Sequence, residues 1–217
     1  MSELADAGHR VIATRWSHEG ADCDQIPRVD VHRLDVADER AVKEFVDQID
    51  REAGGIDVLI NNAAIATPGL MSVSRGDDWK RVIEVNLFGT YHTCKYVARK
   101  MTGRRRGVIL NMASSRALVG AAGVSSYCAS KAAVIALTKC LAVELAPANI
   151  SVNALCPGFV PSRINQFDPA VATQESERSL LGLESCLADI GHLVRFLCSG
   201  SLTGVTGQVF YVDSRSL

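Results

Sequence analysis

The chain contains 217 residues, a length ordinary for one α/β domain. Its 23 basic and 24 acidic residues give a formal net charge of −1, which supplies no general field for attracting nucleic acid or an anionic membrane. Hydrophobic residues make up 47% and charged residues 22% of the chain, which is enough apolar material for a core and argues against global disorder.

Two β-like runs and one helix are expected near the start of the chain. Arg10–Thr14 is a short β-like run, and Arg28–Val36 contains a second run with alternating apolar positions. Asp38 can cap a helix that extends to about Glu52, because apolar residues then recur at spacings of three and four. Two glycines directly after this segment supply the stop signal.

The remaining elements repeat the alternation of strand and helix. Ile56–Ile60 is almost continuously apolar, the pattern of a strand covered on both faces. Further along, the pattern predicts a helix at about Asp78–Met101, a strand at Gly107–Ala113, a helix at about Ser125–Leu145, a strand at Ile150–Leu155, a polar loop at Pro161–Ser179, a helix near Cys186–Cys198 and a strand at Gln208–Val212. This order predicts one α/β domain over residues 1–217, with a doubly wound parallel sheet and helices on both faces.

The cysteines and the start of the chain bear on the cellular compartment. Seven cysteines, an odd number without a CxxC pair, predict reduced thiols in a cytoplasmic protein rather than a disulfide framework or a metal site. The first ten residues are polar, and no apolar stretch reaches the roughly 18 residues that span a bilayer. We therefore expect neither a secretion signal nor a membrane anchor, and no nucleic-acid partner.

Small polar residues follow three of the expected strands. Directly after the three strands come Asn61-Asn62, Ser114-Ser115 and Cys156-Pro157-Gly158. In doubly wound sheets ligands bind beyond the carboxyl ends of the strands, so these segments are candidates for a site. Taken singly, each segment is also ordinary turn chemistry.

Tyr127 and Lys131 are four residues apart on an expected helix and therefore share one face of it. A tyrosine has a pKa near 10, so proton transfer near neutrality needs a group that favours the phenolate. The ammonium of Lys131 is the obvious candidate for that effect. A packed tyrosine beside a solvated lysine is the alternative interpretation of this spacing.

Several motifs in the correct order resemble the short-chain dehydrogenase/reductase family, in particular its 3-oxoacyl carrier-protein reductases. Tyr127–Lys131 resembles the family's YxxxK motif, Ser114 lies at the position of its catalytic serine, and Asn86 lies at the position of its active-site asparagine. Further similarities are Asp35-Val36, the NNAG-like Asn61-Asn62-Ala63-Ala64 and the PGxxxT-like Pro157–Ser162, with Ala64 for glycine and Ser162 for threonine. The resemblance covers nearly the whole chain.

The resemblance implies a role for each matching residue. Tyr127 would be the general acid or base, Lys131 would stabilise the phenolate and hold the nicotinamide ribose, Ser114 would donate a hydrogen bond to the oxyanion, and Asn86 would position a relay water. The cofactor-binding residues implied are Arg15, Asp35, Val36, Asn62, Ala63, Tyr127, Lys131, Pro157, Gly158, Val160 and Ser162. Arg15, without a competing acid after its strand, favours NADP, with NAD as the second candidate.

Four of these residues could instead have a purely structural role. Ser114 could satisfy local backbone at a strand end, and Asn86 could bond a neighbouring carbonyl within its helix. Asp35 could cap the following helix, a role that Asp38 can also fill. Arg15 could be a solvated surface residue.

The start of the chain departs from the family. Members begin with a strand and a glycine-rich turn resembling TGxxxGxG, whereas Ser2–Arg10 resembles only the end of the helix that follows that turn. In the family's sheet order, 3-2-1-4-5-6-7, the absent strand is central. A misassigned start, a truncated paralogue and a subunit that needs a complete partner are the three explanations.

The function implied is hydride transfer between NADP(H) and a carbonyl or secondary alcohol, either a 3-oxoacyl thioester or another small ketone, possibly carrier-bound. The alternative is a non-catalytic, auxiliary subunit of a heteromeric reductase. A homodimer or homotetramer is expected through the helices at residues 78–101 and 125–145, or a heteromer with a full-length relative.

Arg104–Arg106 could meet an acidic carrier or could be a solvated helix end. Phe159 and Phe167 could form apolar walls of the pocket.

Overall fold

The computed structural model describes residues 1–16, 26–160, 162, 164, 173, 175–181, 184–202 and 204–214. Its strands are β1 (Val11–Arg15), β2 (Val29–Arg33), β3 (Val58–Asn61), β4 (Gly107–Met112), β5 (Ile150–Pro157) and β6 (Val209–Val212). All neighbouring strands pair in parallel. The predicted strands are therefore confirmed, with ends shifted by a few residues.

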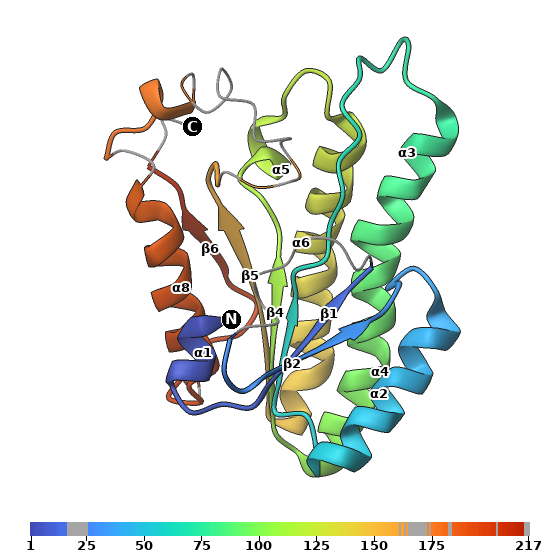
Figure 1. The fold of residues 1–217 in the computed structure, drawn as a ribbon, viewed down its shortest axis with the longest axis vertical. Helices are drawn as coiled ribbons and strands as arrows, with labels where there is room; N and C mark the ends of the chain where they lie inside the picture. Colours follow the sequence, from blue (N-terminus) through green and yellow to red (C-terminus); the bar gives the residue numbers. More distant parts are fainter. Residues whose placement is uncertain are drawn as a thin grey trace.

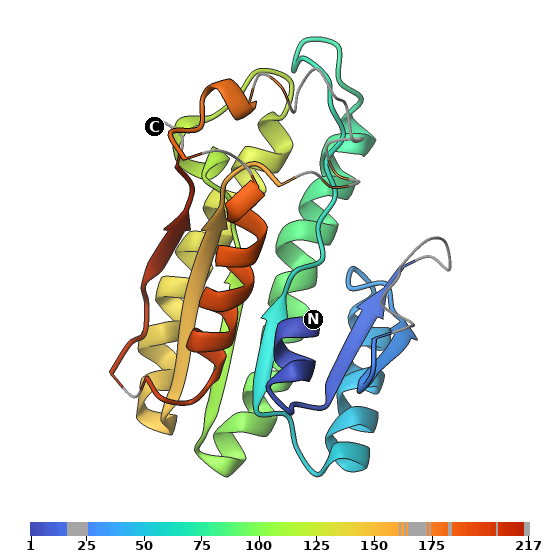
Figure 2. The ribbon, with the colours of Figure 1, turned by 60° about the vertical axis from the view of Figure 1, so that its left-hand side comes forward.

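Helices cover both faces of the parallel strands (Figure 1). They are α1 (Ser2–Asp6), α2 (Glu39–Ala53), α3 (Gly76–Ile83), α4 (Gly89–Arg104), α5 (Arg116–Val119), α6 (Ser125–Leu145) and α8 (Glu184–Cys198). In Figure 2, α1 and α8 lie on one side of the sheet, and α4 and α6 lie on the other. This arrangement confirms the predicted doubly wound α/β fold. No described helix is long and apolar enough to cross a bilayer.

The sheet is divided into two parts. β1 pairs with β2, and the other four strands form a separate sheet in the order β3-β4-β5-β6. Both parts point the same way, with β1 and β3 as the facing edges (Figure 2). Within the described residues no strand is hydrogen-bonded between these two edges, and β1 and β3 do not pair with each other.

The divided sheet changes the surroundings of β3. Its apolar run predicted a strand covered on both faces, but Val58, Leu59 and Ile60 are only half-buried. Leu59 packs against one core cluster and Val58 and Ile60 pack against another, so both faces of β3 are covered as predicted, although in the described chain β3 has a strand neighbour on one side only. Leu4 of α1 packs near Val58 and Ile60 and covers part of this edge.

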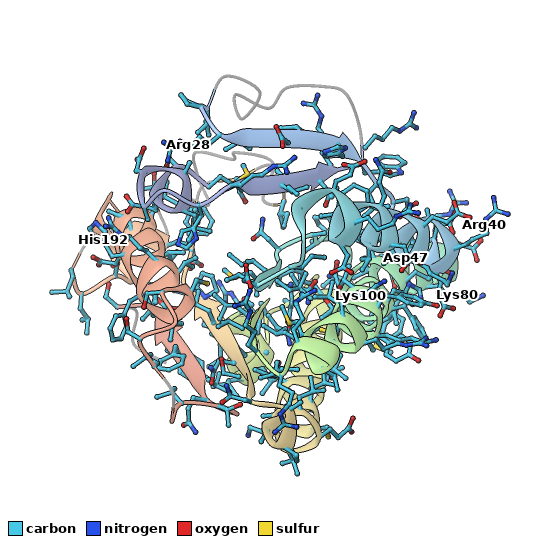
Figure 3. The ribbon with its side chains drawn as sticks, turned by 90° about the horizontal axis from the view of Figure 1, so that it is seen from below. Arg28, Arg40, Asp47, Lys80, Lys100 and His192 are labelled. Carbon is cyan, nitrogen blue, oxygen red and sulfur yellow. The ribbon has the colours of Figure 1, made fainter. Side chains whose placement is uncertain are left out.

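Ion pairs between α2 and α4 help to hold β1 and β2 against the remaining strands. Seen from below, Asp47 on α2 and Lys100 on α4 lie beside each other (Figure 3), with their charged atoms 2.7 Å apart. Lys100 also lies 3.7 Å from Asp50, which pairs with Arg104 at 2.7 Å. Half-buried and networked pairs of this kind contribute more than isolated surface pairs.

The helix predicted from Asp78 to Met101 is interrupted. A π-helical turn at Glu84–Phe88 separates α3 from α4. Thr90 donates its hydroxyl to the carbonyl oxygen of Asn86 at 2.8 Å, so a side chain takes part in the hydrogen bonding of this turn. Apolar spacing reports the buried face of a helix and does not detect one extra residue in a turn.

A chain of buried side-chain hydrogen bonds joins β3, β4, α4 and α6. Thr93 donates to Asn61 at 2.6 Å, Asn61 donates to Asn111 at 2.8 Å, and Asn111 donates to Thr138 at 2.9 Å. Asn61 therefore has a structural role inside the core. Satisfied polar networks of this kind favour one arrangement of the packed elements.

We expect Asn111→Leu to lower the free energy of unfolding by about 2–4 kcal/mol, because it leaves buried polar partners on Asn61 and Thr138 unsatisfied. Chemical denaturation of the purified chain measures the loss. Gln48→Leu likewise replaces a side-chain amide with leucine, but at an exposed position of α2, and should alter stability by no more than about 0.5 kcal/mol. Equal effects of the two substitutions would contradict the role of the network.

Candidate active site

A cavity of about 1340 Å³ lies at the carboxyl ends of β3, β4 and β5. Of the residues proposed from the sequence, those lining it are Asn62, Ser114, Tyr127, Lys131, Pro157, Gly158, Phe159, Val160 and Ser162. Three strand ends and one face of α6 thus bring together residues that are up to 100 positions apart in the chain. Pro161 and Phe167 lie outside the described residues.

Tyr127 and Lys131 line this cavity from consecutive turns of α6. Lys131 is only 2% exposed, and its Nζ donates a hydrogen bond to the carbonyl oxygen of Met112 at 2.6 Å. The same Nζ lies 5.8 Å from the centre of the Tyr127 ring. The spacing in sequence therefore predicted correctly that the amine and the phenol share one site.

The pKa of Tyr127 differs from the expectation. Burial raises the pKa of the phenol above its usual value of 10.0, and the hydrogen bond with Ser114 lowers it to a smaller extent. Burial also lowers the pKa of Lys131 from 10.5 to about 8. The lowering of the phenol's pKa that the sequence predicted from Lys131 is not found, because desolvation of the phenol is the largest cause of its shift and Lys131 is not among the causes.

Ser114 follows β4 and faces the phenol of Tyr127. Its hydroxyl is near enough to the Tyr127 phenol to lower the pKa of that phenol. Its Oγ also accepts a hydrogen bond from the backbone N–H of Arg116 at 3.2 Å. The hydroxyl therefore takes part in the local backbone structure and still reaches the cavity.

Asn86 is buried beneath the cavity and does not line it. Its amide nitrogen donates to the carbonyl of Ile65 at 2.9 Å and to Ser130 Oγ at 3.0 Å, and its Oδ1 accepts from the N–H of Ile65 at 2.8 Å. Both amide hydrogens are thus engaged by protein atoms. The contacts indicate that Asn86 fixes the segment after β3 against α6, and the relay-water role stays a prediction.

Four of the proposed cofactor residues, Arg15, Asp35, Val36 and Ala63, lie outside the cavity lining. Asp35 accepts from Arg81 at 2.9 Å and from the N–H of Ala37 at 3.0 Å, whereas Asp38 caps α2. Val36 belongs to the core and lies directly under Gly89, where a Cβ would come within 2.6 Å of it. Packing in the core therefore explains the presence of an apolar residue at Val36 without a contact to the cofactor.

Gly158 allows the chain after β5 to pass close to the end of β6. A Cβ at this position would lie 2.7 Å from the carboxyl carbon of Asp213, so any side chain would force a displacement. Pro157 and Gly158 therefore form part of the cavity wall because their backbone packs closely against the residue after β6. Their position in the lining also allows them to contact a bound ligand.

Sequence reasoning missed the charged side chains Arg116, Glu175 and Arg178, which line the same cavity. Arg116 lies two residues after Ser114 at the end of an expected strand, and this position could have identified it as a cavity residue from the sequence. Arg104 and Arg106 instead pair with Asp50 and Asp57 at the opposite ends of the strands, away from the cavity. These contacts favour the helix-end interpretation of the basic run over a carrier-binding one.

The chain belongs to the short-chain dehydrogenase/reductase family: the family model described as enoyl-(acyl carrier protein) reductase matches residues 2–214. The 3-oxoacyl-(acyl-carrier-protein) reductase FabG of Thermotoga maritima is 37% identical, over 97% of this chain and 88% of the relative. FabG of Haemophilus influenzae is 32% identical, over 97% and 89%. The protein is therefore an oxidoreductase enzyme.

Solved structures agree with this placement. A gluconate 5-dehydrogenase from Burkholderia cenocepacia, in complex with NADP and tartrate, superposes with a TM-score of 0.90 at 28% identity, covering 98% of this chain and 87% of that one. ElxO with NADP bound superposes with a TM-score of 0.88 at 28% identity, covering 98% and 90%. The Rossmann-type fold predicted from the sequence is confirmed.

Proposed function

We propose that this protein transfers a hydride between NADP(H) and a carbonyl or secondary alcohol substrate. The observation that carries the proposal is the convergence of Tyr127, Ser114 and Lys131 on one cavity at the carboxyl ends of parallel strands. The reductases and dehydrogenases to which the chain is similar support the reaction class.

The roles of the side chains follow from their protonation and contacts. Tyr127 holds its proton at neutral pH, since its pKa lies above the ordinary value of 10.0, so it can donate that proton to a carbonyl oxygen. Ser114 donates a hydrogen bond to the same oxygen as negative charge develops on it. Lys131, with its pKa at about 8, is largely protonated at pH 7 and stabilises the phenolate that remains. NADPH, when bound, supplies the hydride.

The described residues fit the nicotinamide half of the cofactor better than its adenosine half. Asn62, Gly158, Val160 and Ser162 line the cavity beside Tyr127 and would hold the nicotinamide end. Both carboxylate oxygens of Asp35 already accept hydrogen bonds from Arg81 and Ala37, so an adenine amine would compete with them. The described residues therefore support the proposed position of the nicotinamide beside Tyr127 more strongly than the proposed position of the adenosine beside Asp35.

A pair of arginines supports NADP over NAD. Arg15 and Arg33 occupy partner positions at the carboxyl ends of β1 and β2. Two guanidinium groups at adjacent positions suit the extra phosphate of NADP, which Arg recognises through paired hydrogen bonds. The two solved structures with NADP bound support the same choice.

Self-association and a cytoplasmic location complete the proposal. We propose α4 and α6 for a dimer or tetramer interface. Exposed apolar side chains on or next to these helices are Phe88, which ends the π-helical turn before α4, Tyr91 on α4 and Val143 near the end of α6. Free thiols are found at Cys94, Cys128, Cys140, Cys156 and Cys198, which suits a reducing compartment. A solution mass equal to one chain would contradict the interface.

Calorimetric titration with NADPH and then with NADH tests cofactor use. We expect saturable binding of NADPH, at least about tenfold tighter than NADH, because the additional phosphate gains charge-assisted hydrogen bonds. Arg15→Gln should remove most of this preference and leave NADH binding unchanged. Equal affinities for the two nucleotides would refute the assignment of NADP.

A further inference from the structure

The charged side chains in the cavity wall are unbalanced. Among the described lining residues they are Arg116, Lys131, Glu175 and Arg178, three cations and one carboxylate. Lys131 has its place beside Tyr127 in the proposed reaction. The remaining three have no role in proton or hydride transfer, and together they carry one net positive charge beside the site.

The carboxylate of this group is buried and the two guanidinium groups are not. Glu175 is 3% exposed, and one of its oxygens, Oε1, lies 2.7 Å from Arg116 Nη2 and 3.7 Å from Arg178 Nη1. The Arg116 side chain keeps 27% of its surface accessible and that of Arg178 keeps 58%. Each guanidinium presents five donors in a planar fork, so contact with one carboxylate oxygen leaves donors that can face the cavity.

Arg116 is held in a fixed relation to the reacting groups. Its backbone N–H donates to Ser114 Oγ at 3.2 Å, and α5, which it begins, packs on α6, the helix that carries Tyr127. The apolar residues Val119, Val124, Leu187 and Ile190 line the same cavity. A guanidinium with access to a largely apolar pocket is in a setting that strengthens its attraction for an anion.

The position of these residues separates them from the proposed adenosine end of the cofactor. Segment 175–181 lies near the end of β6, where Leu180 donates its N–H to the carbonyl of Ser214 at 3.0 Å. α5, which carries Arg116, follows β4. Both α5 and segment 175–181 lie away from β1 and β2, which carry Arg15 and Arg33 (Figure 1). The cation pair therefore lies in the part of the cavity away from the proposed adenosine end of the cofactor.

We infer that the substrate carries an anionic group, a carboxylate or a phosphate, near its carbonyl or alcohol, and that Arg116 binds this group with assistance from Arg178. The inference rests on the proposed function and narrows its substrate class to oxo and hydroxy acids or their phosphate counterparts. Glu175 holds the two guanidinium groups together and limits their charge before the substrate arrives. The ion pair between Arg116 and Glu175 is sufficient to join α5 to segment 175–181, so this structural role does not require Arg178.

Matched pairs of ketones test the substrate class. The rate of NADPH oxidation is measured with acetoacetate and methyl acetoacetate, levulinate and methyl levulinate, and dihydroxyacetone phosphate and dihydroxyacetone. We expect Arg116→Gln to lower kcat/KM for an anionic member by at least about tenfold and to leave its neutral partner nearly unchanged, as for loss of one charge-assisted hydrogen bond. Arg116→Lys should retain part of the preference, and Arg99→Gln, exposed on α4, should retain all of it.

A purely structural role for Arg116 predicts a different pattern, in which both members of each pair lose activity equally. That result, or a wild-type preference for every neutral member, would overturn the inference. The carboxylate and phosphate pairs distinguish which anion the site takes.

Calorimetry separates this inference from the proposed function. Malonate and inorganic phosphate, which have no ketone to reduce, are titrated into the protein with NADPH present. We expect one of them to bind, to bind more tightly in Glu175→Gln and to lose binding in Arg116→Gln. Such binding without turnover of any ketone would refute the redox proposal and retain the anion site. Absence of binding, or competition between the anion and NADPH, would refute the anion site.

Discussion

Replacing Tyr127 with phenylalanine is expected to lower kcat for ketone reduction by a factor of about 10²–10⁴, the usual contribution of a positioned general acid. The substitution removes one hydroxyl from a side chain that lines the cavity beside Ser114 and Lys131. NADPH binding should be nearly unchanged, because the ring and the surrounding wall stay in place. Steady-state oxidation of NADPH with a ketone substrate measures the loss.

Tyr91 offers a matched control for this substitution. It lies on α4, is 41% exposed and does not line the cavity. Tyr91→Phe should therefore retain the activity of the unaltered protein. Full turnover by Tyr127→Phe would exclude the phenol as the proton donor, whatever the effect on binding.

Replacing Lys131 with methionine is expected to abolish most turnover and to stabilise the fold at pH 7. Burial lowers the pKa of this amine from 10.5 to about 8, which corresponds to roughly 3 kcal/mol of cost when the charged form is buried. Loss of the hydrogen bond to Met112 offsets part of the gain. We expect a net rise of about 1 kcal/mol in the free energy of unfolding.

The pH dependence of that difference identifies its cause. Between about pH 8 and 10.5 the unfolded chain still binds the proton at Lys131 and the folded protein has released it, so the contribution of this group to stability rises with pH. Below pH 8 both states are protonated and the cost is present in full. The advantage of Lys131→Met should therefore vanish and reverse as the pH approaches 10.5.

Denaturation of both proteins at several pH values measures this effect. Lys139→Met removes an exposed amine from the same helix and should show no such pH dependence. A constant difference between Lys131→Met and the unaltered protein across this window would contradict the burial cost assigned to Lys131.

Local patterns predicted those features that depend on one element. α6 begins and ends as predicted, at Ser125 and Leu145, because its apolar residues are numerous and its flanking residues break the helix. α2 begins after the cap at Asp38 and ends at Gly54, whose φ of 70° is readily adopted only by glycine. The pairing of Tyr127 with Lys131 likewise needed only the helical repeat.

Features that depend on tertiary contacts were not predictable in the same way. The sequence gives no sign that Asn61 bonds Asn111 across two strands, or that Asn86 bonds the backbone of Ile65. The raised pKa of Tyr127 depends on how much water the folded site excludes. The approach of Glu175 to Arg116 joins segments 59 positions apart, one of them without a recognisable motif.

Direct transfer of isotope tests the central claim most directly. The protein is incubated with a ketone and NADPH that carries deuterium at C4 of the nicotinamide, and the alcohol is analysed by mass spectrometry. We predict deuterium on the carbinol carbon with the unaltered protein and with Tyr91→Phe, and far less labelled alcohol formed in the same time by Tyr127→Phe. Alcohol without deuterium, or an equal rate of labelled alcohol formation by Tyr127→Phe, would contradict hydride transfer at this site.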